Sequence, residues 1–127
     1  MIILCIDNDS EDIDFFGDAL KKVDPAISFL SAVGGKDALS LLSSIGDHEQ
    51  LPAYIFLDVN MPQMNGKETL IEIRKDHRYD SVQIVMLSTG LNAGNSEEYK
   101  QLGANHFMSK ANSFPDLCEK LRSFFTR

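Results

Sequence analysis

The feature that most constrains this chain is a fivefold alternation between short apolar runs and longer segments with helical spacing. Runs of this length predict buried strands, and the segments between them place apolar residues three or four positions apart, as amphipathic helices do. We expect strands at residues 1–6, 27–33, 54–57, 82–87 and 106–108. We expect helices from an N-cap at Ser10 to 23, from after Gly35 to 45, and at 66–75, 96–102 and 114–125. Strands that alternate with helices predict one α/β domain, in which helices cover both faces of a parallel sheet.

Composition and charge limit the kinds of partner and the cellular location that such a domain can have. The net charge of -7 argues against nucleic-acid binding, which needs a basic surface. No run approaches the roughly 18 apolar residues of a membrane span, and the opening MIILCIDND lacks the basic leader of a secretory signal. We therefore expect a cytoplasmic protein that binds neither nucleic acid nor membrane. Cys5 and Cys118 lie in apolar patterns without metal-binding spacing, which favours buried reduced thiols over a disulfide or a metal site.

Polar side chains stand where the predicted strands end. These residues are Asp7, Asn8 and Asp9 after the first strand, Asp58 after the third, Ser88 and Thr89 after the fourth, and Lys110 after the fifth. Because the carboxyl ends of parallel strands meet at one edge of a sheet, where such folds bind ligands, we expect these side chains to converge. Neighbouring carboxylates repel one another and need a cation, and oxygen ligands of this kind suit Mg²⁺.

The same set of groups predicts phosphoryl-transfer chemistry. A metal ion, an amine and a hydroxyl supply the positioning and charge neutralisation that such a transfer needs, and an aspartate carboxylate can accept the phosphoryl group. Each residue alone has a simpler interpretation. Asp7 and Asp9 suit a helix N-terminus, and Asp58 can cap the turn that follows it. Ser88 and Lys110 are of types common at strand ends and on surfaces. The combination, with each group on a different strand, favours a shared site.

The segment LDVNMPQMNG, residues 57–66, resembles the acceptor segment of response-regulator receiver domains, the phosphoacceptor modules of two-component signalling. The resemblance covers essentially the whole chain. It implies a flavodoxin-like, doubly wound sheet of five parallel strands in the order 2-1-3-4-5 with five helices. It also implies a single receiver domain over residues 1–127, of the stand-alone type with no output domain.

The resemblance also implies a role for each site residue. Asp58 is then the phosphorylated aspartate, and Asp7 and Asn8 stand at the family's acidic pair. The backbone carbonyl of Asn60 completes the shell of a Mg²⁺ ion that Asp7, Asn8 and Asp58 also hold. The remaining matches are Ser88 at the switch hydroxyl, Phe107 at the switch aromatic and Lys110 at the family's invariant lysine.

The function implied is that of a signalling acceptor. A sensor histidine kinase or a histidine phosphotransfer protein would pass its phosphoryl group to Asp58 in a Mg²⁺-dependent reaction. Ser88 and Phe107 would then move and reshape a surface that a downstream protein binds. The chain would not be an enzyme beyond self-catalysed phosphorylation and autodephosphorylation, and it would be a monomer or a weak dimer.

Three residues depart from the family pattern. Asn8 replaces an acidic metal ligand, so Mg²⁺ affinity should fall unless Asp9 helps. Thr89 replaces a smaller residue, which narrows access to Asp58. Ala111 replaces a proline whose preceding bond is commonly cis. Because a cis bond before alanine costs roughly 2.5 to 4 kcal/mol, we expect Lys110–Ala111 to be trans, with Ser113 near the start of the final helix.

Two other functions fit parts of the sequence. Asn8 and Ala111 favour a degenerate receiver that binds partners without being phosphorylated. Alternatively, Asp7-Asn8-Asp9 resembles the nucleophile motif of haloacid-dehalogenase-type phosphatases. The phosphatase interpretation leaves the segment around Asp58 unexplained, and the chain lacks that family's cap domain and its late acidic motif.

Overall fold

The computed structural model describes residues 1–89 and 93–126. Its strands form one parallel sheet in the order β2-β1-β3-β4-β5. The strands are β1 (Ile2–Asp7), β2 (Ser28–Val33), β3 (Tyr54–Asp58), β4 (Gln83–Ser88) and β5 (His106–Ser109). The predicted flavodoxin-like order is therefore confirmed. Each predicted strand is present, with ends that differ by one or two residues.

Five α-helices connect and follow these strands within the described residues. They are α1 (Ser10–Val23), α2 (Gly35–Ser44), α3 (Gly66–Arg74), α4 (Ala93–Gln101) and α5 (Phe114–Phe125). Two short 3₁₀ turns, η1 (His48–Gln50) and η2 (His77–Tyr79), lie in the connections from α2 to β3 and from α3 to β4. The helix α4 begins at Ala93, before the predicted start at Ser96. None of these helices is long and apolar enough to cross a bilayer.

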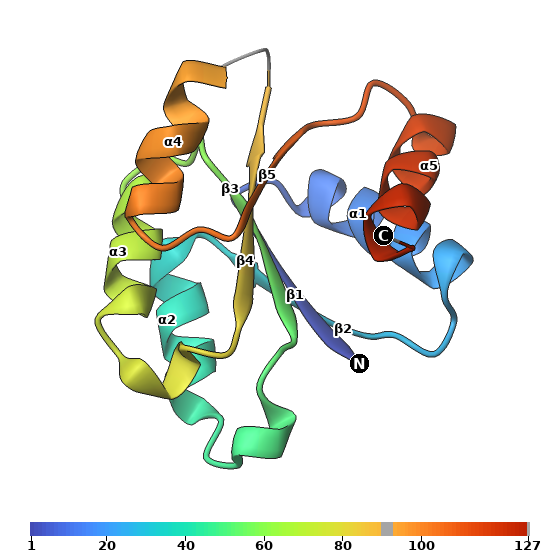
Figure 1. The fold of residues 1–127 in the computed structure, drawn as a ribbon. Coiled ribbons are helices and arrows are strands. Elements are labelled where there is room, and N and C mark those ends of the chain that lie inside the picture. Colours follow the sequence, from blue (N-terminus) through green and yellow to red (C-terminus); the bar gives the residue numbers. More distant parts are fainter. Residues whose placement is uncertain (90–92, 127) are drawn as a thin grey trace.

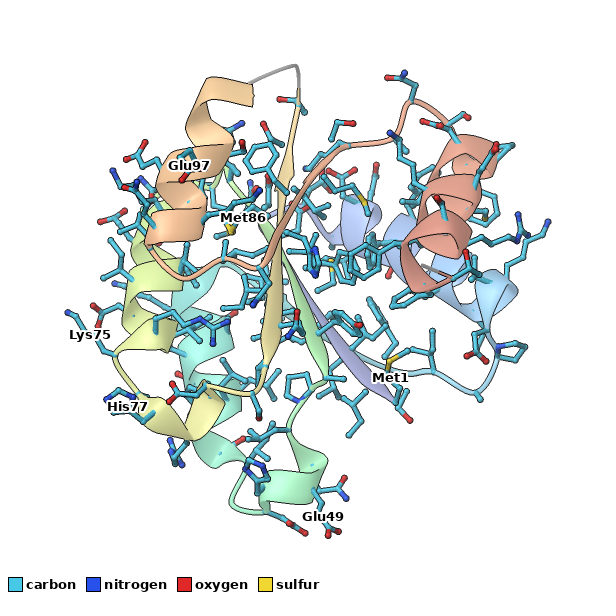
Figure 2. The ribbon with its side chains drawn as sticks, viewed as in Figure 1. Met1, Glu49, Lys75, His77, Met86 and Glu97 are labelled. Carbon is cyan, nitrogen blue, oxygen red and sulfur yellow. The ribbon has the colours of Figure 1, made fainter. Side chains whose placement is uncertain are left out.

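The helices form a layer on each face of the sheet. Figure 1 shows α1 and α5 on one side and α2, α3 and α4 on the other. Alternate residues of β1 enter the two cores: Ile3 and Cys5 pack towards α1 and α5, while Leu4 and Ile6 pack towards the other three helices. In Figure 2, Met86 of β4 lies inside the molecule, where it is fully buried. The predicted two-sided covering of the sheet is therefore confirmed.

Both cysteines lie in the layer between the sheet and the helices α1 and α5. Cys5 and Cys118 are free thiols, and each is only 2% exposed. Burial raises the pKa of the Cys5 thiol far above its usual range, and the nearby Asp7 adds to this effect. Such a thiol stays protonated and unreactive. The prediction of buried reduced thiols is confirmed.

The N-terminus of α1 differs from the prediction in its capping residue. The cap is Asp9, whose Oδ1 accepts a hydrogen bond from the Glu11 N–H at 2.9 Å, while Ser10 is the first helical residue. The prediction of Ser10 as the N-cap was therefore wrong. Asp9 has the extended backbone that a cap needs, and its carboxylate also suits the positive end of the helix dipole.

The loop after β3 is held close to the strand end. The Gly66 N–H donates to the carbonyl oxygen of Val59 at 3.0 Å. A Cβ atom at Gly66 would lie 2.3 Å from the carbonyl oxygen of Asp58 and 2.8 Å from the Val59 Cα, so only glycine fits. Asn65 and Glu68 then form a capping box that starts α3. This return of the chain fixes the backbone that carries the Asp58 carboxylate.

Candidate functional site

The site centres on the amine of Lys110, which follows β5. Its Nζ lies 3.3 Å from Oδ2 of Asp7 and 3.3 Å from Oδ2 of Asp58. These carboxylates end β1 and β3, and their side chains are only 5% and 4% exposed. Asp7, Asp58 and Lys110 therefore converge at the carboxyl edge of the sheet, as predicted from the strand ends. Their chemical roles stay predictions.

The two carboxylates are oriented by the backbone as well as by the lysine. The Asp9 N–H donates to Oδ1 of Asp7 at 3.1 Å, and the Asn60 N–H donates to Oδ1 of Asp58 at 3.2 Å. The other oxygen of each carboxylate is the one that approaches Lys110. One oxygen of each group is thus held in place, while the second faces the shared ammonium.

Burial and neighbouring charge set the protonation behaviour of the site. Burial raises the pKa of Asp58 and Asp7 raises it further, although Lys110 and the Asn60 N–H act in the opposite direction. For Lys110, burial alone would lower the pKa, but Asp58 and Asp7 outweigh it and raise the pKa. The lysine therefore stays charged, and Asp58 is a more basic carboxylate than an exposed aspartate.

The donor set fits a partly hydrated hard cation. Asp7 and Asp58 offer two buried carboxylates, and the exposed residue Asn8 directly follows Asp7 in the chain. No group of three or more His, Cys, Asp or Glu in the described part of the chain is arranged as a metal cage. Mg²⁺ needs no such cage, because it binds through one or two carboxylates and keeps several waters. The proposed oxygen donors at Asn8 and Asn60 stay predictions.

Ser88 is the last residue of β4, and the hydrogen bond described for its hydroxyl does not go to Asp58. It is only 1% exposed, and its hydroxyl donates to the carbonyl oxygen of Thr89 at 3.2 Å. The side chain of Thr89 is exposed. Ser88 is therefore at the predicted strand end, with its hydroxyl bonded to the next residue of the chain. Its role as a switch hydroxyl, and the narrowing of access by Thr89, stay predictions.

Phe107, the predicted switch aromatic, is a half-buried residue of β5. It packs against the core under α2, α3 and α4, and its ring centroid lies 5.9 Å from that of Tyr99 in α4. Tyr99 is itself only 8% exposed. A movement of Phe107 would therefore change its contact with Tyr99 and so affect α4. Whether such a movement accompanies phosphorylation is a prediction.

The connection from Lys110 to α5 runs through Ala111 and ends at a capped helix. Residues 1–89 and 93–126 contain no cis peptide bond, so the predicted trans bond between Lys110 and Ala111 is confirmed. Ser113 is the N-cap of α5, and its side chain accepts from the Asp116 N–H at 3.2 Å. Lys110 thus reaches Asp7 and Asp58 although the bond after it is trans.

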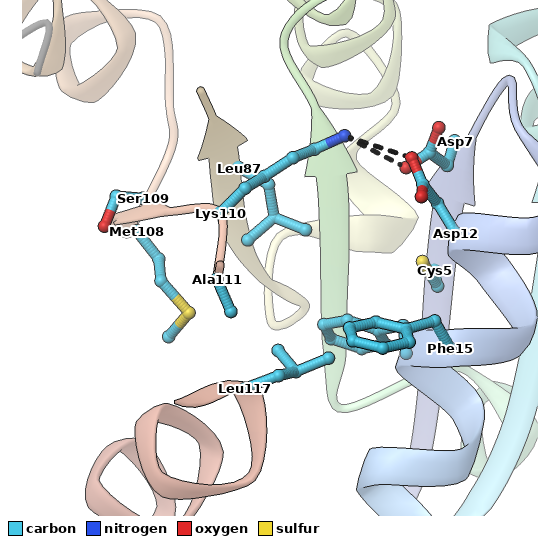
Figure 3. Close-up of a pocket in the computed structure, with 11 residues that line it drawn as sticks. Cys5, Asp7, Asp12, Phe15, Leu87, Met108, Ser109, Lys110, Ala111 and Leu117 are labelled. Atoms are coloured by element: carbon cyan, nitrogen blue, oxygen red, sulfur yellow. Dashed lines mark hydrogen bonds and ion pairs between the residues drawn. The ribbon is translucent and has the colours of Figure 1, made fainter. Parts of the chain in front are cut away.

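The sequence reasoning missed a third carboxylate near the lysine. Oδ2 of Asp12, in the first turn of α1, lies 3.8 Å from the Lys110 Nζ (Figure 3). A small cavity of about 100 Å³ opens next to these charges. The sequence did contain one indication of this contact: Asp12 falls in the first turn of the helix predicted after the first strand. That turn must lie near the strand end from which the helix departs.

Known proteins are similar to nearly all of this chain. The family described as the response regulator receiver domain matches residues 3–122. Response regulator Rcp1 of Synechocystis is 25% identical over 118 residues, which cover 91% of this chain and 80% of Rcp1. Chemotaxis protein CheY1 of Helicobacter pylori is 31% identical over 99 residues, covering 72% of this chain and 78% of CheY1. Some matches are to longer proteins: the chain spans 26% of Response regulator Rre1 of Synechocystis and 13% of the sensor histidine kinase CheAY of H. pylori.

Solved structures share the fold at lower sequence identity. The phosphorylated cyanobacterial phytochrome response regulator RcpA superposes with a TM-score of 0.82 at 24% identity, covering 97% of this chain and 89% of RcpA. The Mn²⁺-bound form of Rcp1 superposes with a TM-score of 0.81 at 24% identity, covering 98% of this chain and 91% of Rcp1. At this identity the superpositions establish the arrangement of strands and helices alone.

Proposed function

Because this chain belongs to the response regulator receiver domain family of two-component signalling, we propose that the carboxylate of Asp58 accepts a phosphoryl group. The observation that carries the proposal is the pair of 3.3 Å contacts from the Lys110 ammonium to Asp58 and Asp7. A buried carboxylate beside a fixed ammonium is suited to accept a phosphoryl group, because the ammonium offsets the charge of the incoming oxygens. The family membership confirms the resemblance seen in residues 57–66.

The proposed reaction uses the ionised form of Asp58. One oxygen of the carboxylate attacks phosphorus, a P–O bond forms, and the bond from phosphorus to the histidine nitrogen of the donor breaks in line with it. Lys110 is placed to pair with the phosphoryl oxygens, and the Asn60 N–H keeps the carboxylate from rotating. Asp7, Asn8, Asp58 and the Asn60 carbonyl would hold a Mg²⁺ ion, which supplies further positive charge to the phosphoryl oxygens when bound.

The partners follow from this chemistry. The phosphoryl donor would be a sensor histidine kinase or a histidine phosphotransfer protein. A downstream protein would then bind a surface of this chain that changes on phosphorylation. Phe107 supports this view, because its ring packs on Tyr99 of α4 and so connects β5 to this helix. Phosphoryl acceptance and autodephosphorylation are the only reactions that we propose. The phosphorylated form of RcpA and the Mn²⁺-bound form of Rcp1 support this reaction class for related folds.

The proposal predicts metal-dependent incorporation of one phosphoryl group per chain from acetyl phosphate. Asp58 is the acceptor because it ends the central strand beside both Asp7 and Lys110. Intact-mass spectrometry should show a single added phosphoryl group in the presence of Mg²⁺ and none in the presence of EDTA. An unmodified mass with Mg²⁺, for a chain with a normal circular dichroism spectrum, would contradict the proposal.

Replacing Lys110 by alanine should slow phosphorylation by about a hundredfold, because removing one preorganised charge from such a site has an effect of this order. Mg²⁺ binding should persist, since both carboxylates remain. The control is Lys75→Ala, because Lys75 is exposed at the C-terminal end of α3, where it pairs with Glu72. Stopped-flow or quenched mass measurements give the rates. Equal rates for the two variants would mean that Lys110 has no role in the transfer.

A further inference from the structure

We propose that Asp12 supplies the third negative charge of the divalent-cation site, in place of the charge that Asn8 lacks. The inference rests on the proposed function and adds a residue to it. Asp12 comes from a helix, whereas Asp7 and Asp58 end strands. It was not among the residues that the family resemblance assigns.

The position of Asp12 is fixed by the way the chain enters α1. Asp9 caps this helix through the Glu11 N–H, and its own N–H donates to Oδ1 of Asp7 at 3.1 Å. The end of β1 and the first turn of α1 are therefore joined by hydrogen bonds. Figure 3 shows Asp7 and Asp12 side by side, both directed at the amine of Lys110.

Among the carboxylates within ion-pair distance of Lys110, charge balance with a divalent cation requires Asp12. Asp7 and Asp58 carry two negative charges, one of which Lys110 offsets. Asp12, 3.8 Å from the same ammonium, brings the excess to two negative charges, which one divalent cation neutralises. An acid at position 8 would give the same total without Asp12. The neutral Asn8 and the charged Asp12 thus form a compensating pair.

Asp12 acts on the cation without binding it directly. Its side chain is 55% exposed, and the described residues contain no cluster of three carboxylates close enough to form a metal cage. Mg²⁺ keeps several of its waters, and an exposed carboxylate next to the site can accept hydrogen bonds from them. We therefore assign Asp12 a positioning role, through water and through its charge.

A simpler role for Asp12 is to stabilise α1, because acids in the first turn of a helix interact favourably with its dipole. Glu11 separates the two roles. It lies in the same turn, is exposed and carries the same charge, yet the structure places no Glu11 oxygen within ion-pair distance of Lys110. Asp12→Asn and Glu11→Gln should lower the stability of α1 alike, whereas only Asp12→Asn should weaken cation binding.

The test is Mn²⁺ titration of the whole chain, with free Mn²⁺ followed by electron paramagnetic resonance and Mg²⁺ used as competitor. Asp12→Asn should weaken Mn²⁺ binding by about fivefold, as expected for the loss of one nearby charge at a partly exposed site. Glu11→Gln should change the affinity by less than about twofold, since its charge is more screened. Adding Asn8→Asp to Asp12→Asn should restore at least the original affinity.

The outcomes distinguish this inference from the proposed function. If the unchanged chain binds Mn²⁺ and accepts a phosphoryl group, but Asp12→Asn and Glu11→Gln bind Mn²⁺ equally well, Asp12 only stabilises its helix and the inference is wrong. Failure of Asn8→Asp to restore the affinity of Asp12→Asn would also overturn it. If the unchanged chain neither binds Mn²⁺ nor accepts a phosphoryl group, the proposed function itself fails.

Discussion

Replacing Asp58 by asparagine should abolish phosphoryl acceptance and, at neutral pH, raise the free energy of unfolding. The amide has nearly the same shape but no nucleophilic oxygen, so no acyl phosphate can form. The same change removes a buried negative charge that lies beside Asp7, while the ion pair between Lys110 and Asp7 remains. We expect a gain of about 1 kcal/mol, as functional sites often sacrifice stability.

The stability gain should depend on pH in a direction set by the pKa of Asp58. Burial and Asp7 raise this pKa in the folded protein, so the folded chain binds the proton more tightly than the unfolded chain does. The native carboxyl therefore favours folding below its unfolded pKa, and this contribution is lost as pH rises through the raised folded value. The advantage of Asp58→Asn should be largest at neutral pH and should shrink as the solution becomes acidic.

Urea unfolding at several pH values, together with intact-mass measurement after acetyl phosphate treatment, checks both parts. Asp14→Asn is the matched control, because Asp14 is an exposed aspartate of α1, and it should leave both properties nearly unchanged. If Asp58→Asn were less stable than the unchanged chain at neutral pH, the attraction between Lys110 and Asp58 would outweigh the cost of burying the Asp58 charge.

The second large effect is expected at Arg74, the last residue of α3. Its Nε donates to the carbonyl oxygen of Gly103 at 2.9 Å, and its Nη1 donates to that of Tyr79 at 2.7 Å. Its Nη2 donates to the carbonyl oxygen of Val82 at 2.7 Å and to Oδ1 of Asn105 at 3.0 Å. One half-buried guanidinium thus joins the connections that lead into β4 and β5.

Truncating Arg74 to alanine should lower the free energy of unfolding by about 3 to 4 kcal/mol. Each lost hydrogen bond contributes about 1 kcal/mol, and the carbonyl oxygens left without this partner add a penalty. Arg74→Lys should recover only part of the loss, because an ammonium cannot reproduce the planar fork of donors. Phosphorylation by acetyl phosphate should survive in the folded fraction.

Arg78→Ala is the control for Arg74, and urea unfolding followed by circular dichroism gives the comparison. Arg78 is an exposed arginine whose guanidinium pairs with Asp76 and donates to the Tyr79 hydroxyl, so its loss should lower stability far less than the loss of Arg74. If Arg74→Ala were as stable as Arg78→Ala, the four hydrogen bonds of Arg74 would contribute nothing to folding. If Arg74→Lys were fully stable, the fork geometry would be unimportant.

The arrangement of strands and the place of the site could be predicted from the sequence for a physical reason. Apolar runs such as residues 54–57 report burial on both faces of a sheet, and the groups at their ends must share one edge. The convergence of Asp7, Asp58 and Lys110 follows from that topology. The trans bond at Ala111 was predictable because only proline makes a cis bond inexpensive.

Other features depended on three-dimensional contacts that no local pattern reports. The capping of α1 by Asp9 rather than Ser10 depends on where the backbone turns from extended to helical. The approach of Asp12 to Lys110 depends on the angle at which α1 leaves β1. The guanidinium of Arg74 makes hydrogen bonds to segments far apart in sequence. These bonds could not be predicted, because an arginine in a helical pattern is equally common on an exposed helix surface.

The most direct test of the central claim is to locate the acyl phosphate after brief treatment with acetyl phosphate and Mg²⁺. Borohydride reduces an aspartyl phosphate to homoserine, and peptide mass spectrometry then identifies the modified position. We predict homoserine at Asp58 and at no other aspartate. Homoserine at Asp7 or Asp9 would favour the phosphatase interpretation, and its absence from a folded, Mg²⁺-bound chain would favour a degenerate receiver. Either result would contradict the assignment of Asp58 as the phosphoryl acceptor.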